Sequence, residues 1–363
     1  MKKKLASVCA IALVFAMLVS GCGSSGNQGA TEEAAAETAE TVEAEAETET
    51  EAETAETETA GEEASPEETK ADGMTIGISI NALGNIHNRH MFEGLKATCE
   101  SRGHEVIGVN ANGDATQQVT DVENLIQAGC DVIVIQCADS FSMKNVVADA
   151  ASKGIYVISQ DAGWIEGCSA MVQLNYFSIQ TDICMMLGAE IGYEGKIITT
   201  GHQDNFALRA AGYVHDAMIE EWGFEEVAHV QTTYPGTTEV TYNGLDSALT
   251  ANPDVDAIFT SQDLEAMGAI QALKEHDLYP QVKCVGIDGE VDVLRDIKDG
   301  GCVLCTVISD IDGANEAVCN TAEKLMAGQS VQKYISVPYD IVTIDNVDEF
   351  LEKAEAEAAQ YAE

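Results

Sequence analysis

The stretch 124-NLIQAGCDVIVIQCADS-140 decides the fold of this chain of 363 residues. Its beginning closes an amphipathic segment, 114–129, whose apolar side chains fall on one helical face and whose last residue is a glycine, the usual residue just past a helix end. Residues 130–136 then form a nearly continuous apolar run rich in β-branched side chains. Such runs are typical of strands that helices cover on both faces of a parallel sheet.

The same pair of apolar run and amphipathic stretch recurs on both sides of this segment. Strands are expected at 74–80, 104–111, 130–136, 155–160, 196–201, 226–233, 256–261 and 283–288. The segment 171–192 separates the first set from the second. Two sets of strand-helix units within 74–363 favour an α/β fold with two doubly wound parallel-sheet lobes over one oversized sheet.

The N-terminus has the pattern of an export signal. MKKK precedes an apolar core of about 14 residues, which is too short to span a bilayer. The LVSGC that follows at 18–22 resembles the lipobox of bacterial lipoproteins. This resemblance implies a signal peptide at 1–21, a lipid on Cys22 and an extracytoplasmic protein anchored to the outer face of the cell membrane. The alternative is a soluble protein whose first helix is apolar.

Residues 22–73 have a different composition, made mostly of Glu, Thr and Ala. They hold 17 acidic residues and a single lysine, Lys70. Such a segment cannot bury enough apolar surface to offset the entropy of ordering it. We therefore expect an acidic, disordered tether between the lipid and the folded part.

The charge of the folded part excludes some partners. Residues 74–363 carry 45 acidic and 14 basic residues, a net charge of −31. This charge argues against nucleic acid and against electrostatic binding to an anionic membrane. The nine cysteines of this part lie mostly in apolar runs, where a free thiol behaves as a small buried hydrophobe. Cys302 and Cys305 have C-x-x-C spacing, but an apparent strand there points them to opposite faces.

Polar residues follow strand after strand in this pattern. Open α/β sheets bind ligands outside the carboxyl ends of their strands, so these residues are candidates for one site. Singly, each also fits a turn or helix-cap position; together they predict a hydrogen-bonding cage for a polar small molecule. The candidates are Asn81, Asn85, Gln136, Asp161, Gln203, Asp204, Arg209, Gln262, Asp263 and Asp288.

From 74 to about 345 the chain resembles the periplasmic sugar-binding proteins of the ribose/galactose type, the solute receptors of ABC importers. The resemblance rests on the segments IGISINALGNIHNRHMFEGLK, NLIQAGCDVIVIQCADS, GIYVISQDA, RAAGY, LTANPDVDAIFTSQDLEAMGAIQAL and VGIDG. It implies the type I periplasmic binding protein fold, in which three crossovers form the hinge. The expected lobes are 74–174 plus 311–337 and 175–310 plus 338–363.

The resemblance also implies ligand-binding positions, taken one at a time. Two aromatic positions that stack on the sugar correspond to His87 and Asn88, so this chain departs from the family there. An arginine usual after the fourth strand is replaced by Ala162. The other positions correspond to Asn81 and Asn85 in the first loop, Gln136, Asp161, Arg209 of the R-x-x-G-aromatic motif, Gln262 with Asp263, Asp288, and Ser309 at the third crossover region.

These departures argue against ribose and leave the ligand open among hexoses, other pentoses, inositol-like polyols and autoinducer-like furanosyl compounds. Trp164, just after Asp161, can supply a stacking face for a sugar ring, although packing against its own loop is an equal alternative. Tyr234 lies near another aromatic position of the family and can serve the same purpose.

Two histidines three residues apart, His87 and His90, raise the alternative of a metal site. Residues i and i+3 share a helix face, and His202 is the candidate for a third ligand. The sequence has no H-x-x-x-H or clustered Cys/His pattern in this region. We therefore expect no metal and no other cofactor, and a hydrogen-bonding role for His87.

The resulting expectation is a monomeric, lipid-anchored solute-binding protein that delivers a sugar or polyol to an ABC permease. A sensor that presents its ligand to a membrane receptor is the alternative with the same fold. A transcriptional regulator is disfavoured because the lipobox and tether precede residue 74, where a DNA-binding domain would stand. No catalytic motif such as G-x-S-x-G or H-E-x-x-H is present, so we expect no enzyme and no catalytic residue.

Overall fold

The computed structural model describes residues 73–203 and 205–360 of the chain. The expected signal peptide at 1–21, the lipidated Cys22 and all of the expected tether at 22–73 except Gly73 lie outside the described residues. The described residues belong to one compact unit. None of the helices described in it is both long and apolar enough to cross a membrane.

The first lobe is built on a six-stranded sheet with the order β11-β5-β4-β3-β1-β2, in which every pair is parallel. Its strands are β1 (Thr75–Ile80), β2 (Glu105–Asn110), β3 (Val132–Gln136), β4 (Tyr156–Gln160), β5 (Ala170–Gln173) and β11 (Tyr334–Ser336). Four helices cover this sheet: α1 (Ile86–Ser101), α2 (Ala115–Gln127), α3 (Lys144–Ser152) and α9 (Ile311–Met326).

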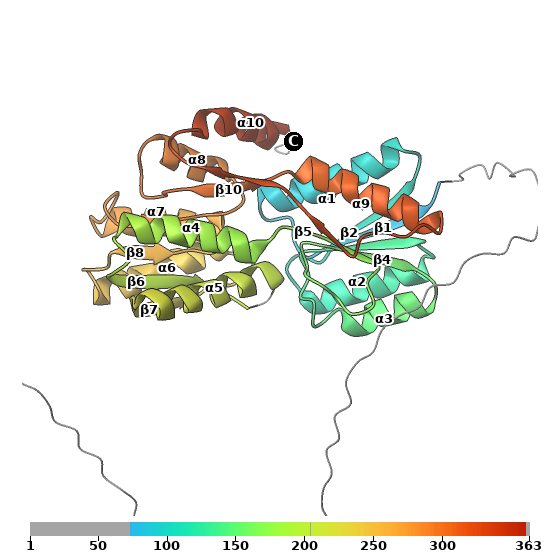
Figure 1. The fold of residues 1–363 in the computed structure, drawn as a ribbon, viewed down its shortest axis with the longest axis horizontal. Coiled ribbons are helices and arrows are strands. Elements are labelled where there is room, and N and C mark those ends of the chain that lie inside the picture. The colour runs from blue at the N-terminus through green and yellow to red at the C-terminus, as the bar shows by residue number, and fades with distance from the viewer. Residues whose placement is uncertain (1–72, 204, 361–363) are drawn as a thin grey trace, which may run out of the picture. The chain divides into compact units, whose positions relative to one another are not determined.

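The two faces of this sheet pack against different helices (Figure 1). Val132 and Val134 of β3 belong to the core cluster that includes residues of α1 and α9. Ile133 and Ile135, which alternate with them, belong to the cluster under α2 and α3. All four side chains are fully buried. The apolar run at 130–136 is thus a central strand covered on both faces, as its composition predicted.

The second lobe carries a four-stranded parallel sheet with the order β7-β6-β8-β9. Its strands are β6 (Lys196–Gly201), β7 (Glu225–Gln231), β8 (Ala257–Phe259) and β9 (Lys283–Cys284). Its helices are α4 (Tyr176–Glu190), α5 (Phe206–Trp222), α6 (Thr237–Ala251), α7 (Asp263–Glu275), α8 (Val291–Lys298) and α10 (Val347–Gln360). The predicted fold class, two doubly wound parallel-sheet lobes, is confirmed.

An antiparallel pair, β10 (Thr306–Ser309) with β12 (Tyr339–Val342), accompanies the second sheet and was not predicted. The expectation that Cys302 and Cys305 lie in a strand was wrong, because both precede β10. Only Val303 between them makes an isolated bridge, to Cys284. Both cysteines are fully buried.

The chain passes between the lobes three times. It leaves the first lobe after β5, returns to it between β10 and α9, and leaves it again between β11 and β12. Helix caps mark the ends of two of these passages. The side chains of Asn175 and Asp310 accept hydrogen bonds from backbone N–H groups at the starts of α4 and α9, the helices with which the chain enters the other lobe. We therefore propose 74–174 with 311–337 and 175–310 with 338–363 as the two lobes.

Candidate ligand-binding cleft

A cavity of about 470 Å³ lies at the carboxyl ends of strands from both lobes. In doubly wound sheets this edge is where ligands bind. Ten of the fifteen residues expected at the site line it: Asn81, Asn85, His87, Asn88, Asp161, Gln203, Arg209, Tyr234, Gln262 and Asp288. The structure therefore brings side chains from positions more than 200 residues apart to one polar cleft.

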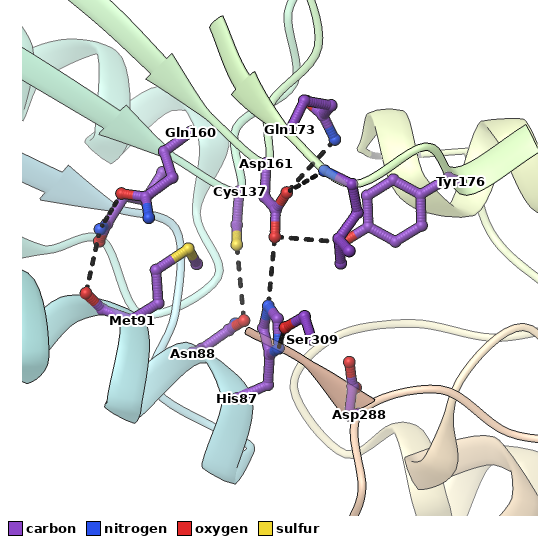
Figure 2. A network of polar contacts seen from close by, with 12 residues as sticks. His87, Asn88, Met91, Cys137, Gln160, Asp161, Gln173, Tyr176, Asp288 and Ser309 are labelled. Atoms are coloured by element: carbon purple, nitrogen blue, oxygen red, sulfur yellow. Dashed lines mark hydrogen bonds and ion pairs between the residues drawn. The ribbon is translucent and has the colours of Figure 1, made fainter. Parts of the chain in front are cut away.

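The floor of the cleft is a network centred on Asp161 (Figure 2). His87 Nε2 lies 3.2 Å from Asp161 Oδ2, and both side chains are only 6% exposed. The Tyr176 hydroxyl donates to the same oxygen at 3.3 Å, and the backbone N–H of Leu174 donates to the other at 3.3 Å. Asp161 itself has a left-handed backbone, with φ of 52°. A non-glycine residue in that conformation is strained and is often found at functional sites.

The electrostatic environment of His87 favours its charged form. Burial alone lowers the pKa of this imidazole, but the hydrogen bond to Asp161 and the negative charges of Asp288 and Asp161 outweigh it, so the pKa is raised. His87 stands in the first turn of α1, whose N-cap is Asn85. The helix thus places an imidazole with a raised pKa in the cleft.

Asp288 faces the cleft from the second lobe. It follows β9 in a loop with φ of 123°, and its Oδ2 accepts a hydrogen bond from Asn85 Nδ2 at 3.0 Å. Burial raises the pKa of Asp288 to about 7; His87 opposes this rise, while the neighbouring charges of Glu290 and Asp161 add to it. This carboxyl group therefore changes its protonation near neutral pH.

Arg209 connects the lobes on the other side of the cleft. It lies in the first turn of α5, where Asn205 caps the helix. Its Nη1 donates to Asp139 Oδ1 of the first lobe at 2.9 Å, and its Nη2 donates to Ser140 Oγ at 3.1 Å. The guanidinium also lies over the ring of Phe141, 4.7 Å from its centroid. One planar cation is thus fixed at the cleft wall by three groups of the opposite lobe.

Tyr234 is the candidate stacking residue that lines the cleft. Its ring packs against Gly84, where an added Cβ would lie 1.8 Å from the Tyr234 hydroxyl oxygen, and against Gly113. The other candidate, Trp164, does not line the cavity; its side chain is 47% exposed, with Lys333 Nζ 5.9 Å from the ring centroid. Of the two predicted stacking residues, Tyr234 is therefore the one that is placed to offer its ring to a bound ligand.

Gln136 and Ser309 also lie outside the main cavity. Gln136 is fully buried and donates to Gln160 Oε1 at 2.9 Å, because the last side chain of β3 points into the lobe. The next residue, Cys137, lines the cleft instead. Ser309 lies behind His87 in a small adjacent cavity, with its hydroxyl 3.4 Å from His87 Nδ1.

Several lining residues were missed by the reasoning from sequence. They are Asp139 and Phe141 in the loop before α3, Tyr176 at the start of α4, and Cys137. Asp139 and Phe141 follow a strand by three to five residues, so a wider window after each predicted strand would have found them. Tyr176 follows β5 (Ala170–Gln173) by three residues, but no strand was predicted there, so such a window would not have reached it.

The three histidines of the expected metal alternative do not converge. His87 and His202 line the cleft, but His90 Nε2 points away to Asp312 Oδ1 at 2.8 Å, and its ring also contacts Glu357. Among the described residues, the one group of His, Cys, Asp and Glu side chains close enough to share an ion contains none of them. Asp204 lies outside the described residues.

Comparison with known proteins agrees with this architecture. Residues 76–330 match the model of a periplasmic binding protein domain. The ribose import binding protein RbsB of Bacillus subtilis (strain 168) is 27% identical over 273 residues, covering 74% of this chain and 87% of the relative. A xylitol-binding protein of Mycolicibacterium smegmatis is 25% identical, covering 83% of this chain and 85% of the relative. A solved ABC transporter solute-binding protein from Bacillus halodurans C-125 with bound myo-inositol superposes with a TM-score of 0.71 at 25% identity, covering 78% and 99% of the two chains.

Proposed function

Because this chain belongs to the family of periplasmic binding protein domains, we propose that it captures a sugar or polyol between its lobes and delivers it to an ABC importer. The observation that carries the proposal is the composition of the cleft. Carboxylates, amides, two histidines and an arginine from both lobes line one cavity of a size suited to a small molecule. The ligands named for relatives, ribose, xylitol and myo-inositol, are all polyhydroxylated.

The chemistry of the cleft suits hydroxyl groups. Asp161 and Asp288 accept hydrogen bonds, and Arg209 donates them in a planar fork that can hold two adjacent oxygens. The ring of Tyr234 supports stacking on the apolar face of a cyclic ligand. A neutral polyol satisfies such groups without bringing a charge of its own.

The delivery step follows from closure of the lobes. A ligand that touches both lobes binds their closed arrangement more tightly than the open one, and so shifts the population toward closure. Contacts such as Arg209 with Asp139 and Asn85 with Asp288 already join the lobes across the cleft. The closed surface is then what a permease recognises, and no bond of the ligand has to break.

The proposed place of action is outside the cytoplasm, with the lipid on Cys22 holding the protein at the outer face of the cell membrane. The acidic segment 22–73 lets the binding unit reach a permease while it stays tethered. Both walls of the cleft come from one chain, so a monomer suffices. Mass spectrometry of the protein from a membrane fraction tests the lipid: a diacylglycerol mass on Cys22 supports it, and an unmodified N-terminus overturns it.

Thermal unfolding and calorimetry with a ligand panel test the binding function. The panel contains pentoses, hexoses, acyclic polyols, inositols and nucleosides, each measured with and without EDTA. A compound at 100 times its Kd stabilises the protein by about 2.7 kcal/mol, which raises the Tm by several degrees. The expected result is such a shift for one class, unchanged by EDTA and lost in Asp161→Asn. If no compound of the panel binds, the proposal fails.

A further inference from the structure

A second cluster of chemically reactive side chains lies at the opposite edge of the first sheet from the cleft. His104 stands between the end of α1 and the start of β2, and Cys319 and Glu323 lie on α9. Each of the three offers one ligand atom, and these atoms all lie within 4.8 Å of one another. His104 Nε2 is 3.2 Å from Glu323 Oε1.

The packing of two helices creates this cluster. Cys319 and Glu323 are four residues apart on α9 and therefore share a face of that helix. Cys99 lies in the last turn of α1, and its thiol is in hydrogen-bond contact with the sulfur of Cys319. Both cysteines are fully buried. Two thiols, an imidazole and a carboxylate thus meet where α1 packs on α9.

Arg102, the C-cap residue of α1, borders the cluster. Its Nη1 lies 3.2 Å from Glu323 Oε2, and it also contacts Glu316. Cys319 binds a metal as its thiolate, so binding of the ion releases the proton of the thiol.

His104 directs its Nε2 at the Glu323 carboxylate, 3.2 Å from Oε1, while its Nδ1 is buried and has no hydrogen-bond partner among the described residues. Binding of a metal through Nε2 requires the neutral imidazole with its proton on Nδ1. A cation between Nε2 and the carboxylate replaces the repulsion between that lone pair and the carboxylate by attraction to both.

We propose that His104, Cys319 and Glu323 bind a Zn²⁺ ion. Nitrogen, thiolate and carboxylate donors are those of zinc sites, in which a water molecule can take the fourth tetrahedral position. Ligand atoms of such a site are about 3.3–3.8 Å apart, so the side chains have to approach one another by about 1 Å. The ion ties α9 to α1 and stabilises the first lobe at a distance from the ligand cleft.

The test uses the full chain, purified with its thiols reduced, and two metals. Zn²⁺ is titrated by calorimetry, and Cd²⁺ by the near-ultraviolet absorption that a thiolate–cadmium bond produces. We expect one tight equivalent and a rise in Tm with Zn²⁺. Cys319→Ser should abolish the Cd²⁺ absorption and weaken Zn²⁺ binding at least tenfold. Cys130→Ser, which replaces another buried cysteine of the same lobe, is the matched control and should bind as the wild type does.

Glu323→Gln guards against a folding defect in the cysteine variant, because the Glu323 side chain is 39% exposed. It should keep its far-ultraviolet circular dichroism and weaken Zn²⁺ at least tenfold. The acidic surface of this chain can collect Zn²⁺ weakly elsewhere. Equal Zn²⁺ affinity in the wild type, Cys319→Ser and Glu323→Gln, or Cd²⁺ absorption that survives Cys319→Ser, would overturn the site.

Discussion

Asn85 of the first lobe donates a hydrogen bond to Asp288 of the second, with Nδ2 and Oδ2 3.0 Å apart. The same Asn85 caps α1, and the first N–H of that helix, at Ile86, donates to Glu290 Oε1 of the second lobe at 2.9 Å. The N-terminus of a helix carries a partial positive charge that favours such a carboxylate. The start of α1 is therefore both a wall of the cleft and a contact between the lobes.

Replacement of Asp288 should stabilise the protein at alkaline pH. The pKa of Asp288 is about 7 in the fold, against about 3.9 for an exposed aspartate. The folded state therefore binds the proton more tightly, so this carboxyl group lowers stability as pH rises from about 4 to 7. We expect Asp288→Asn to raise the free energy of unfolding by about 1–2 kcal/mol at pH 8 and to have little effect at pH 4, measured by urea denaturation.

Asp139→Asn is the control of opposite sign. Although burial acts against it, hydrogen bonds from Ser142 and Phe141 and the charge of Arg209 hold the pKa of Asp139 below its usual range. Its contribution is therefore present at neutral pH and is lost as pH falls through its folded pKa, so Asp139→Asn should destabilise the protein at pH 8. Stabilisation by Asp288→Asn that is equal at pH 4 and pH 8 would contradict the assignment of a titrating carboxyl group.

His90 should contribute stability at low pH that is lost as pH rises, the opposite of the dependence expected for Asp139. Burial lowers the pKa of His90, but Glu357 of α10 and Asp312 of α9 outweigh it and raise the pKa. A raised histidine pKa stabilises the fold below about pH 6.5, and this stabilisation is lost as pH rises through the folded pKa. We expect His90→Gln to cost about 0.5–1 kcal/mol at pH 6 and almost nothing at pH 9. Urea unfolding of the wild type and His90→Gln at both pH values measures this cost. If His90→Gln costs the same free energy of unfolding at pH 6 and pH 9, the effect comes from packing and not from the charge of His90.

Arg209→Lys should weaken ligand binding although it keeps the charge. A lysine cannot donate simultaneously to Asp139 and Ser140 in the planar geometry of the guanidinium, nor stack on Phe141 in the same way. We expect the Kd of the best ligand of the panel to rise about 10–100-fold in calorimetry, with the Tm of the unliganded protein lowered only slightly. Wild-type affinity in Arg209→Lys would mean that the planar guanidinium group of Arg209 is not needed for ligand binding.

Gly84→Ala should disfavour the closed arrangement of the lobes. The added Cβ would lie 1.8 Å from the Tyr234 hydroxyl oxygen, so the ring of Tyr234 has to move away from the first lobe. We expect at least a tenfold rise in Kd and a larger radius of gyration with ligand, measured by X-ray scattering. In a Tyr234→Ala background the clash is absent, so Gly84→Ala should then cost much less. The same cost in both backgrounds would refute the steric explanation.

The parts of the fold that were predictable from sequence are those that local pattern determines. The run at 130–136 predicts a strand buried on both faces, and β3 is one. The amphipathic segment predicted at 114–129 is α2, and its first residue, Asp114, caps the helix by accepting from the backbone N–H groups of Thr116 and Gln117. The pairing of β11 with β5, at the edge of the first sheet, depends on residues about 160 positions apart and leaves no local signal.

The sequence predicted which loops form the candidate site, but not which side chain of each loop lines it. A strand that ends at Gln136 marks the right edge of the sheet, but the backbone turns there, with φ of 54° at Cys137. That turn sends Gln136 into the core and Cys137 to the cleft. The contact of Arg209 with Asp139 joins residues of opposite lobes, and only the folded arrangement of the lobes reveals it.

The split origin of the first lobe has a consequence for how the chain folds. Helix α9 and strand β11 come from residues 311–336, yet they complete the cover of α1 and the edge of a sheet that begins at residue 75. While the chain is being synthesised, α1 lacks its cover by α9 until almost the whole protein has emerged. Contacts of such high sequence separation slow folding and prolong the exposure of apolar surface. A nascent chain that folds late in this way stays unfolded longer, which is the state that a secretion channel needs and that a chaperone has to protect.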